Sequence, residues 1–461
     1  MTVEENMDDG LGKIRTSRSF LRFAVPTVIM MVFTSSYVMF DGLIISNTLG
    51  TDALAAANLT MPVFSLFSAI GFMFASGGVA LVGMKIGEGK TSEANSNFTT
   101  ITITAIGASL VITVICLLMV GNVVSFLGAD EVLKPMTTDY LTYWVLFSPF
   151  LILQFLFQQF IIAAGRPGLS LIISISAGLA NIGLDLLFIM GFGWGVAGAA
   201  VASGLSSVFP ALIGIYFFRP GSNSSLRFST PSKDAAVVGK ACSNGVSEMV
   251  SEISGSISTL LLNIYMMSLV GPDGVSAITI ILYVQFLAMA IIIGYSIGVA
   301  PLMAYNYGKG DRDTMSLLYR TSISFTLVFS VFVFAFMELF GGIVVSLFEA
   351  GNDHLHEIAV EGIAIHSIAY LFMGLNMYVS SFFTSLSNGL LSAIVSGLRA
   401  LVLLVPILVL FEASFGLVGL WASIPVTELI TVVIAVVFVV RSADRYGYRL
   451  FTHRGSEPKT L

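Results

Sequence analysis

Long apolar stretches, separated by short polar segments, follow one another along nearly the whole chain. Most of them contain few or no charged side chains. A stretch of about 20 apolar residues is what an α-helix needs to cross a bilayer, so the pattern predicts membrane-spanning helices. Twelve spans are expected, at residues 20–46, 56–84, 97–120, 137–163, 168–191, 196–219, 240–268, 275–304, 317–339, 357–384, 390–412 and 417–441.

The basic residues support this span count. With the N-terminus in the cytoplasm, every lysine and arginine except Lys134 and the intramembrane Arg399 falls on the cytoplasmic side. If one crossing had been missed, the basic residues after it would lie on the opposite side of the membrane. The positive-inside rule therefore indicates a multi-pass protein with both termini in the cytoplasm. We expect it in the cytoplasmic (inner) membrane of a prokaryote.

Composition narrows the function. Hydrophobic residues make up 56% of the 461-residue chain and charged residues only 10%, which excludes most soluble enzymes. The formal net charge of −6 argues against a nucleic-acid partner. The two cysteines, Cys116 and Cys242, lack the spacing of a metal site and are expected to fill apolar space.

The sequence consists of two similar halves. One constant offset, which we call the duplication offset, aligns Gly77 with Gly298 and Gly87 with Gly308, among others. Six spans per half put both halves in the same orientation, so a cleft between two lobes is expected, as in an alternating-access carrier. The expected parts are a cytoplasmic tail (1–19), an N-lobe (20–219), a cytoplasmic inter-lobe loop (220–239), a C-lobe (240–441) and a second cytoplasmic tail (442–461).

Several motifs resemble those of the multidrug and toxic compound extrusion (MATE) transporters. They are MPVFSLFSAIGFMFASGGVALVGMKIGEGKTSEA, NIGLDLLFIMGFGWGVAGAAVAS, the turn GRP and APLMAYNYGKGD. The resemblance covers essentially residues 20–440. It implies an all-α, V-shaped pair of pseudo-symmetric six-helix lobes that exports organic cations and other amphiphiles in exchange for Na⁺ or H⁺. The chain departs from the commoner pattern at Leu186, where a proline is frequent, and at SIGVAP, where a glutamine is frequent.

Few ionisable side chains lie within the spans, and two of them share one layer. Asp41 in span 1 and Asp185 in span 5 both lie roughly 8 to 9 Å below the outer boundary. Asn181 lies one turn from Asp185 on the same face, and Ser203 of span 6 reaches a similar depth. Such oxygen ligands suit Na⁺, and two adjacent carboxylates can instead share a proton. The resemblance carries the family's N-lobe ion site onto these four residues.

A simpler interpretation of the two aspartates remains open. Asp41 could cap a helix end near the outer headgroups, and Asp185 could accept hydrogen bonds from backbone. Under the duplication offset Asp41 aligns with Leu262 and Asp185 with Pro406, so the acids are not expected to recur in the C-lobe. The predicted ion site is therefore specific to the N-lobe.

The C-lobe carries a different set of charges. Glu248 and Glu252 lie one turn apart on span 7, and Glu248 and Arg399 of span 11 are both roughly 12 to 14 Å from the inner boundary. A buried Glu248–Arg399 ion pair is therefore expected, either as a structural staple or as a gate. Glu428 and His366 are candidates for polar contacts to substrate or proton, although His366 also fits a satisfied interior histidine.

These features favour a secondary active antiporter for multidrug efflux. Its expected partners are small amphiphilic substrates and membrane lipids. Na⁺ or H⁺ is the coupling ion, no cofactor is expected, and the chain is expected to act as a monomer. A flippase for lipid-linked oligosaccharide or peptidoglycan precursors is the nearest alternative, but it should need several deep basic residues and only Arg399 fits. A membrane enzyme or a channel is a further alternative, although no HExxH motif occurs.

Overall fold

The computed structural model describes residues 11–348 and 352–449, most of which are helical. The first half contains α2 (Ser17–Leu49), α3 (Thr51–Leu59), α4 (Met61–Gly87), α5 (Thr91–Leu118), α6 (Val120–Phe126), α7 (Leu133–Ala163), α8 (Pro167–Asp185), the π-helical η1 (Leu186–Gly191) and α9 (Gly195–Phe217). The second half contains α10 (Ala236–Leu269), α11 (Pro272–Lys309), α12 (Arg312–Ser346), α13 (Asp353–His366), η2 (Ser367–Ala369), α14 (Tyr370–Ser385), α15 (Gly389–Gly397), the π-helical η3 (Leu398–Val402) and α16 (Leu404–Tyr446).

Ten helical stretches of the described chain are long and apolar enough to cross a membrane. Two further expected spans are contained in the fold. The helix α10 is 34 residues long but carries Lys240, Glu248 and Glu252, which make it less apolar. The helix α16 continues from span 11 into span 12 through Gly416, whose φ of 58° interrupts the regular helix. With these two, the all-α fold has the twelve spans that the sequence predicts.

Glycines with positive φ separate several of the spans, and they recur at duplicated positions. Three pairs related by the duplication offset have nearly equal φ angles: Gly50 (91°) and Gly271 (87°), Gly89 (75°) and Gly310 (74°), and Gly195 (59°) and Gly416 (58°). Glycine adopts such a backbone without the steric cost that a Cβ atom brings. The duplication inferred from the sequence is therefore present in the backbone as well.

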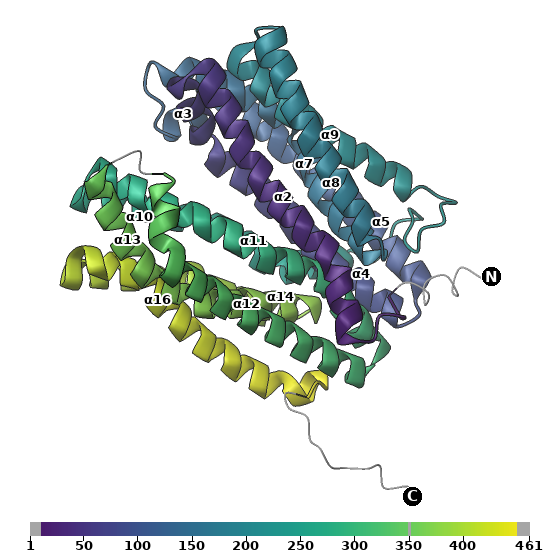
Figure 1. Ribbon diagram of the computed structural model, residues 1–461. Coiled ribbons are helices and arrows are strands. Elements are labelled where there is room, and N and C mark those ends of the chain that lie inside the picture. Colours follow the sequence, from purple (N-terminus) through teal and green to yellow (C-terminus); the bar gives the residue numbers. More distant parts are fainter. Residues whose placement is uncertain (1–10, 349–351, 450–461) are drawn as a thin grey trace, which may run out of the picture.

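The two halves form separate lobes. In Figure 1 the first half (purple to teal) lies beside the second half (green to yellow). Contacts between the halves are made mainly by α2 and α4 on one side and by α10 and α11 on the other. The lobes diverge toward the end that carries α3 and α13, and they meet near the points where the described chain begins and stops. We call the latter the terminal end.

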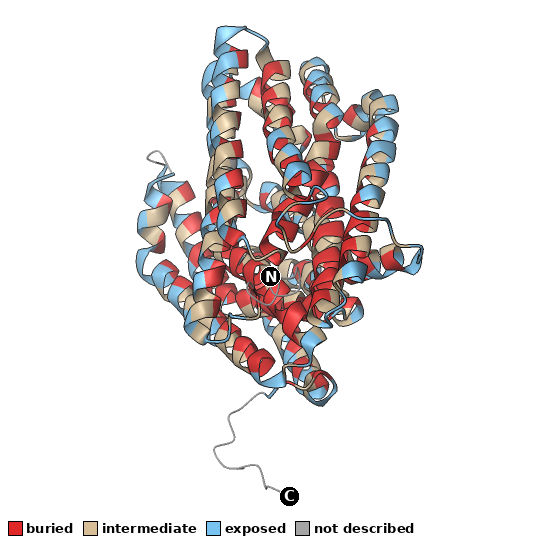
Figure 2. Cartoon of the chain, turned by 90° about the vertical axis from the view of Figure 1, so that its right-hand side faces the viewer, coloured by how far each residue is buried: buried red, intermediate tan, exposed pale blue. Residues whose placement is uncertain are grey.

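Burial follows this arrangement. Figure 2 shows buried residues concentrated toward the terminal end and more exposed residues on the helices away from it. One buried apolar cluster includes Phe67 and Phe98 of the N-lobe and continues to Leu302 of α11. A second cluster, around Tyr370 and Trp421, lies within the C-lobe. The lobes therefore share a core at the terminal end, whereas the part of the C-lobe away from that end has a core of its own.

The connection between the lobes is attached to the N-lobe. The backbone N–H groups of Arg227 and Ser229 donate to Asn95 Oδ1 (2.9 Å) and Thr99 Oγ1 (3.0 Å) on α5. The ring of Phe228 stacks on a phenylalanine of α5, with 5.1 Å between centroids. The segment expected as a loop at 220–239 is thus held along α5 for much of its length, and α10 begins before the expected end of the loop.

The first and seventh spans correspond in a different register from the one expected. Gly294 of α11 lies against Val28 of α2. Met73 of α4, which aligns with Gly294 under the duplication offset, lies against Gly245 of α10. Val28 and Gly245 therefore occupy equivalent positions in the two lobes. This register differs from the duplication offset by about one helical turn. Continued along the helix, this register places Asp41 opposite Ser258, whereas the duplication offset gives Leu262. The conclusion that the acid is not repeated is unchanged.

Candidate functional site

Two helices bring the aspartates of spans 1 and 5 together. Asp41 lies in the last third of α2, and Asp185 is the last residue of α8, directly before the π-helical η1. The Asp185 side chain is fully buried, and Asp41 is half-buried. Their carboxyl groups lie within hydrogen-bonding reach of each other. Two carboxylates this close repel each other unless a cation or a shared proton lies between them.

Asn181 and Ser203 lie beside the carboxyl groups. The buried Asn181 lies one turn before Asp185, and its Nδ2 donates to the Oγ of Ser203 on α9 (3.3 Å). Asn181 Oδ1, Asp41 Oδ1 and both carboxylate oxygens of Asp185 receive no hydrogen bond from the described part of the chain. The four residues of the predicted layer are thus gathered in one cluster, which we call the carboxyl cluster. Their role as ion ligands stays a prediction.

Two tyrosines next to the carboxyl cluster were missed at the level of sequence. Tyr140 of α7 is buried, with its hydroxyl beside Ser203 and within electrostatic range of both carboxyl groups. Tyr37 lies one turn before Asp41 on α2 and is close to that aspartate. The spacing of Tyr37 and Asp41 is a signal that the sequence does contain, because residues four apart share a helix face. Nothing in the sequence around Tyr140 marks it.

The chemistry of the carboxyl cluster is that of oxygen ligands. Two carboxyl groups, an amide oxygen and a hydroxyl suit a hard monovalent cation such as Na⁺, and the carboxyl pair can equally hold a proton. Within the described residues, no group of three or more His, Cys, Asp or Glu side chains is placed to hold a metal ion. The residues therefore fit a monovalent cation or a proton better than a centre built on several acids, histidines or cysteines.

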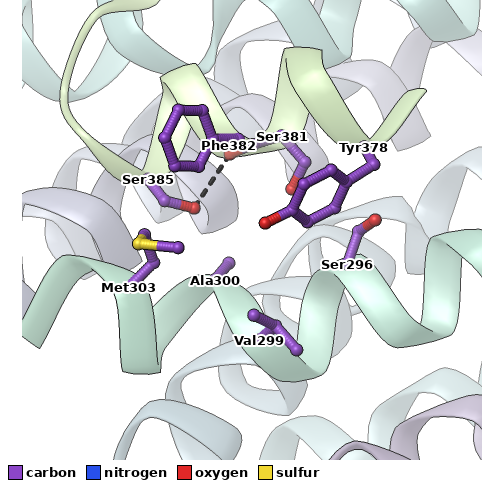
Figure 3. A pocket seen from close by; sticks show the side chains of 8 residues that line it. All are labelled: Ser296, Val299, Ala300, Met303, Tyr378, Ser381, Phe382 and Ser385. Atoms are coloured by element: carbon purple, nitrogen blue, oxygen red, sulfur yellow. Dashed lines mark hydrogen bonds between the residues drawn. The ribbon is translucent and has the colours of Figure 1, made fainter. Parts of the chain in front are cut away.

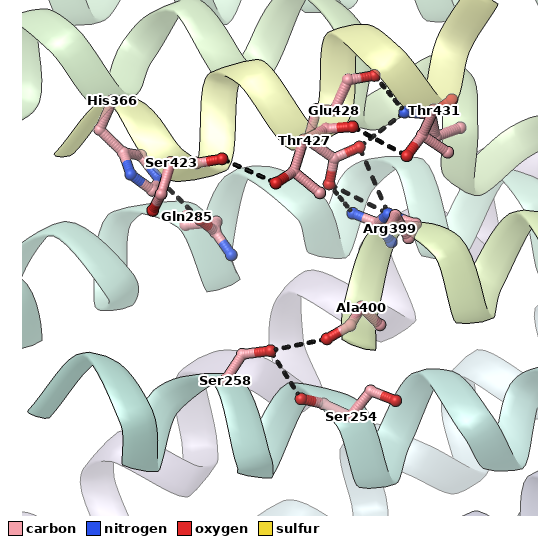
Figure 4. Close-up of polar contacts among 11 residues, drawn as sticks. Ser254, Ser258, Gln285, His366, Arg399, Ala400, Ser423, Thr427, Glu428 and Thr431 are labelled. Carbon is pink, nitrogen blue, oxygen red and sulfur yellow. Dashed lines mark hydrogen bonds and ion pairs between the residues drawn. The ribbon is translucent and has the colours of Figure 1, made fainter. Parts of the chain in front are cut away.

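In the C-lobe, Arg399 pairs with a different acid from the one expected. Its Nη2 lies 2.6 Å from Glu428 Oε1, and its Nε donates to the same oxygen (3.0 Å) (Figure 4). Asn376 Nδ2 donates to the other carboxylate oxygen, Oε2 (2.6 Å). The predicted Glu248–Arg399 ion pair is therefore wrong, because equal depth does not determine which helix face points at which neighbour. The helix α16, and not α10, supplies the acid.

The remaining C-lobe candidates lie around this pair. Glu248 and Glu252 are half-buried on α10, and neither forms an ion pair with any described residue. Glu248 interacts electrostatically with Arg399 across a longer distance. His366 is buried, and its Nε2 lies 2.8 Å from Gln285 Oε1 on α11 (Figure 4). That contact is the one expected of a satisfied interior histidine.

A chain of buried hydroxyl groups joins α10 to α14 and α15. Ser247 of α10 is 3.0 Å from Thr384 of α14, which is 2.7 Å from Ser392 of α15. The contacts continue from Ser392 to Ser380 (2.8 Å) and from Ser380 to Ser396 (2.7 Å). Each of these five hydroxyl groups has a hydrogen-bond partner. A buried network whose members are all hydrogen-bonded makes packing more specific. Polar contacts therefore connect α10, α14 and α15 within the C-lobe.

A small pocket between α11 and α14 lies apart from these charges. Ser296 and Met303 of α11 and Tyr378 and Ser385 of α14 are among the residues that line it (Figure 3). None of the lining residues is charged. The pocket therefore lacks a group that could bind an ion or a cationic substrate by charge.

Comparison with known families follows the same duplication. The model of the MatE family matches the chain twice, at residues 26–187 and at residues 249–410. The chain belongs to the MATE family of transporters. The first match includes both aspartates of the carboxyl cluster, and the second includes Arg399. The family expected from the sequence motifs is thus confirmed.

Similar MATE proteins match over nearly their whole length. The chain is 25% identical over 433 residues to the multidrug export protein MepA of Staphylococcus aureus, covering 93% of this chain and 94% of that protein. MepA of Staphylococcus haemolyticus is 24% identical over 437 residues, with the same coverage. A multidrug resistance MATE transporter in an outward-facing conformation superposes with a TM-score of 0.88 at 21% identity, over 95% of this chain and 98% of that one. The two-lobe MATE fold of this multi-pass membrane protein is therefore confirmed.

Proposed function

We propose that the protein is a secondary active antiporter that exports amphiphilic, cationic compounds in exchange for Na⁺ or H⁺. The adjoining carboxyl groups of Asp41 and Asp185 carry this proposal. Acidic side chains inside membrane spans are costly, and they mark ion or proton pathways in transporters. Relatives that are named as multidrug export proteins support a drug-like cargo.

Coupling in the proposed cycle depends on the carboxyl cluster. An ion can drive transport only if it binds the two states with different affinity. An external cation binds at the carboxyl cluster and promotes release of substrate toward the end where the lobes diverge. The terminal end faces the cytoplasm in this proposal, because the basic residues gather on that side of the twelve-span arrangement.

A flippase for pyrophosphate-linked lipids has less support. Such a carrier needs exposed positive charge to hold the pyrophosphate group. Arg399, the basic residue deep in a span, is neutralised by Glu428 and has a side chain that is only 16% exposed. The C-lobe therefore offers little free positive charge for an anionic headgroup.

The first prediction concerns the two aspartates of the carboxyl cluster. Asp41→Asn or Asp185→Asn should leave the protein folded in the membrane, because the amide has nearly the shape of the carboxyl group. Each should abolish gradient-driven export, because the carboxyl pair that binds the ion is lost. Export of a fluorescent cation from proteoliposomes, under separately imposed Na⁺ and pH gradients, measures the loss and identifies the ion.

Asp52→Asn is the matched control for this experiment. Asp52 is an exposed aspartate in the first turn of α3, outside the carboxyl cluster. Its amide variant should export normally. Normal export by the Asp41→Asn/Asp185→Asn double variant would overturn the proposed function.

A further inference from the structure

Glycines let the two lobes touch backbone to backbone at the terminal end. A Cβ atom at Gly87 of α4 would collide with the carbonyl oxygen of Tyr305 on α11. A Cβ atom at Gly308 of α11 would collide with the carbonyl oxygen of Met84 on α4. The duplication offset that relates the two halves turns the first contact into the second. The lobes are therefore closed at this point by a reciprocal contact around a pseudo-twofold axis.

The same kind of contact continues along the interface. A Cβ atom at Gly77 of α4 would meet the backbone of α10, and one at Gly245 of α10 would meet the backbone of α4. On the other side of the axis, α11 lies against α2 near Ala24 and Thr27, again at glycines. We call the six positions the glycine seal: Gly77, Gly87, Gly245, Gly294, Gly298 and Gly308.

We propose that the glycine seal sets the balance between the observed state and a state in which the lobes separate at the terminal end. All six contacts join one lobe to the other, so they must break together when that end opens. A side chain added at such a position is crowded only in the closed arrangement and therefore shifts the populations toward the open one. This inference goes beyond ion-coupled export, and its tests need neither ion nor substrate. Its failure would leave the proposed function untouched.

Alanine substitutions test the proposal with controls on the same fold. Gly87→Ala and Gly308→Ala place a methyl group into the seal. Gly107→Ala on α5 and Gly255→Ala on α10 add the same group where, apart from the adjoining turns of the same helix, nothing lies within 4 Å of the new Cβ. Crowding of a packed contact typically shifts an equilibrium by roughly tenfold or more. Only the seal variants should show this shift.

Two readouts report on opposite ends of the molecule. The native Cys242 is half-buried on α10 beside the seal, so its maleimide labelling rate, measured with Cys116 replaced by serine, should rise about tenfold when the terminal end opens. At the far ends of α2 and α10, spin labels at Asn47→Cys and Ser268→Cys, in a background without the native cysteines, should move closer together. Double electron–electron resonance measures that distance.

The reciprocity of the seal gives a sharper expectation. The Gly87→Ala/Gly308→Ala double variant should show less than the product of the single effects, because a slight parting of α4 and α11 that accommodates one methyl group in the closed state also makes room for the other. Gly83→Ala is a milder variant, since its Cβ would come no closer than 3.0 Å to the methyl group of Ala304. It should give an intermediate shift and keeps the test usable if the stronger variants fail to fold. Unchanged labelling and distances in every variant that folds, whether a seal variant or Gly83→Ala, would overturn the proposal, and so would an equal shift in Gly107→Ala.

Discussion

Arg399 and Glu428 form an ion pair that is largely withdrawn from solvent, with side chains that are 16% and 4% exposed. Asn376 completes the hydrogen bonding of the carboxylate. Removing one partner of a buried pair leaves an uncompensated charge, which typically costs about 3 to 5 kcal/mol in soluble proteins. The pair therefore tolerates loss of both partners better than loss of one.

We expect Arg399→Gln and Glu428→Gln each to lower the melting temperature of the detergent-solubilised protein clearly. The Arg399→Gln/Glu428→Gln double variant should recover part of the loss, because no unpaired charge is left. Glu361→Gln, at an exposed glutamate of α13, should have little effect and serves as the control. A double variant that loses the sum of the single effects would show that the residues do not act as a pair.

Depth within the membrane could be predicted from the sequence, but orientation about the helix axis could not. Helical rise alone placed Asp41 and Asp185 in one layer, and the structure brings their carboxyl groups together. The same reasoning assigned Glu248 to Arg399, because both lie at similar depth. It also gave no means of finding Tyr140, which reaches the carboxyl cluster from a helix far away in sequence.

At the scale of elements, the segment after α9 behaves as part of the N-lobe. Three of its backbone N–H groups bond to side chains of α5, the last of them from Ser232 to Thr100 Oγ1 (2.7 Å). These bonds end just before α10 begins. Within the connection between the lobes, the few residues between Ser232 and α10 are thus the part that these bonds to α5 do not hold.

Limited proteolysis tests this attachment, because Arg227 and Lys233 are trypsin sites within the segment. Phe228→Ala removes the ring that packs on α5 and should accelerate cleavage at Arg227 several-fold. Asn95→Ala removes an acceptor of one backbone bond and should act in the same direction. Asn223→Ala, at an exposed position of the segment, should cleave like the unmodified protein. Equal cleavage rates in all variants would contradict the attachment.

Most elements could be predicted because an apolar run of span length has few alternatives in a membrane. Their irregular parts could not. The π-helical η1 begins directly after Asp185, and the π-helical η3 contains Arg399. Such turns are frequent at functional sites, but no apolar or polar pattern marks them in advance.

At the scale of the whole molecule, the span count and the duplication were accessible from the sequence. Both depend on patterns that extend over tens of residues, and the matching φ angles of duplicated glycines confirm the second. The closeness of the lobes at the terminal end was not accessible. A glycine in a helix is equally compatible with lipid contact and with close approach of another backbone, so Gly87 and Gly308 gave no indication of facing each other's lobe.

The proposed topology has a direct test, in a background with both native cysteines replaced by serine. Glu131→Cys, close to Lys134, should react with a membrane-impermeant maleimide added outside the cell. Asn223→Cys, in the connection between the lobes, should react only after the membrane is opened. The cysteine-free protein should not label. Labelling of the two sites in the opposite order would contradict the proposed orientation.

The presence of the carboxyl cluster in only one lobe limits how steeply the transporter could concentrate its cargo. On its proposed role, each cycle returns a single monovalent cation. Exchange for a singly charged cargo would then move no net charge, so a tenfold ion gradient, about 1.4 kcal/mol, would support at most a tenfold cargo gradient. A neutral cargo would also draw on the membrane voltage, about 2.3 kcal/mol per 100 mV. Uncharged compounds would therefore be expelled against steeper gradients than cationic ones.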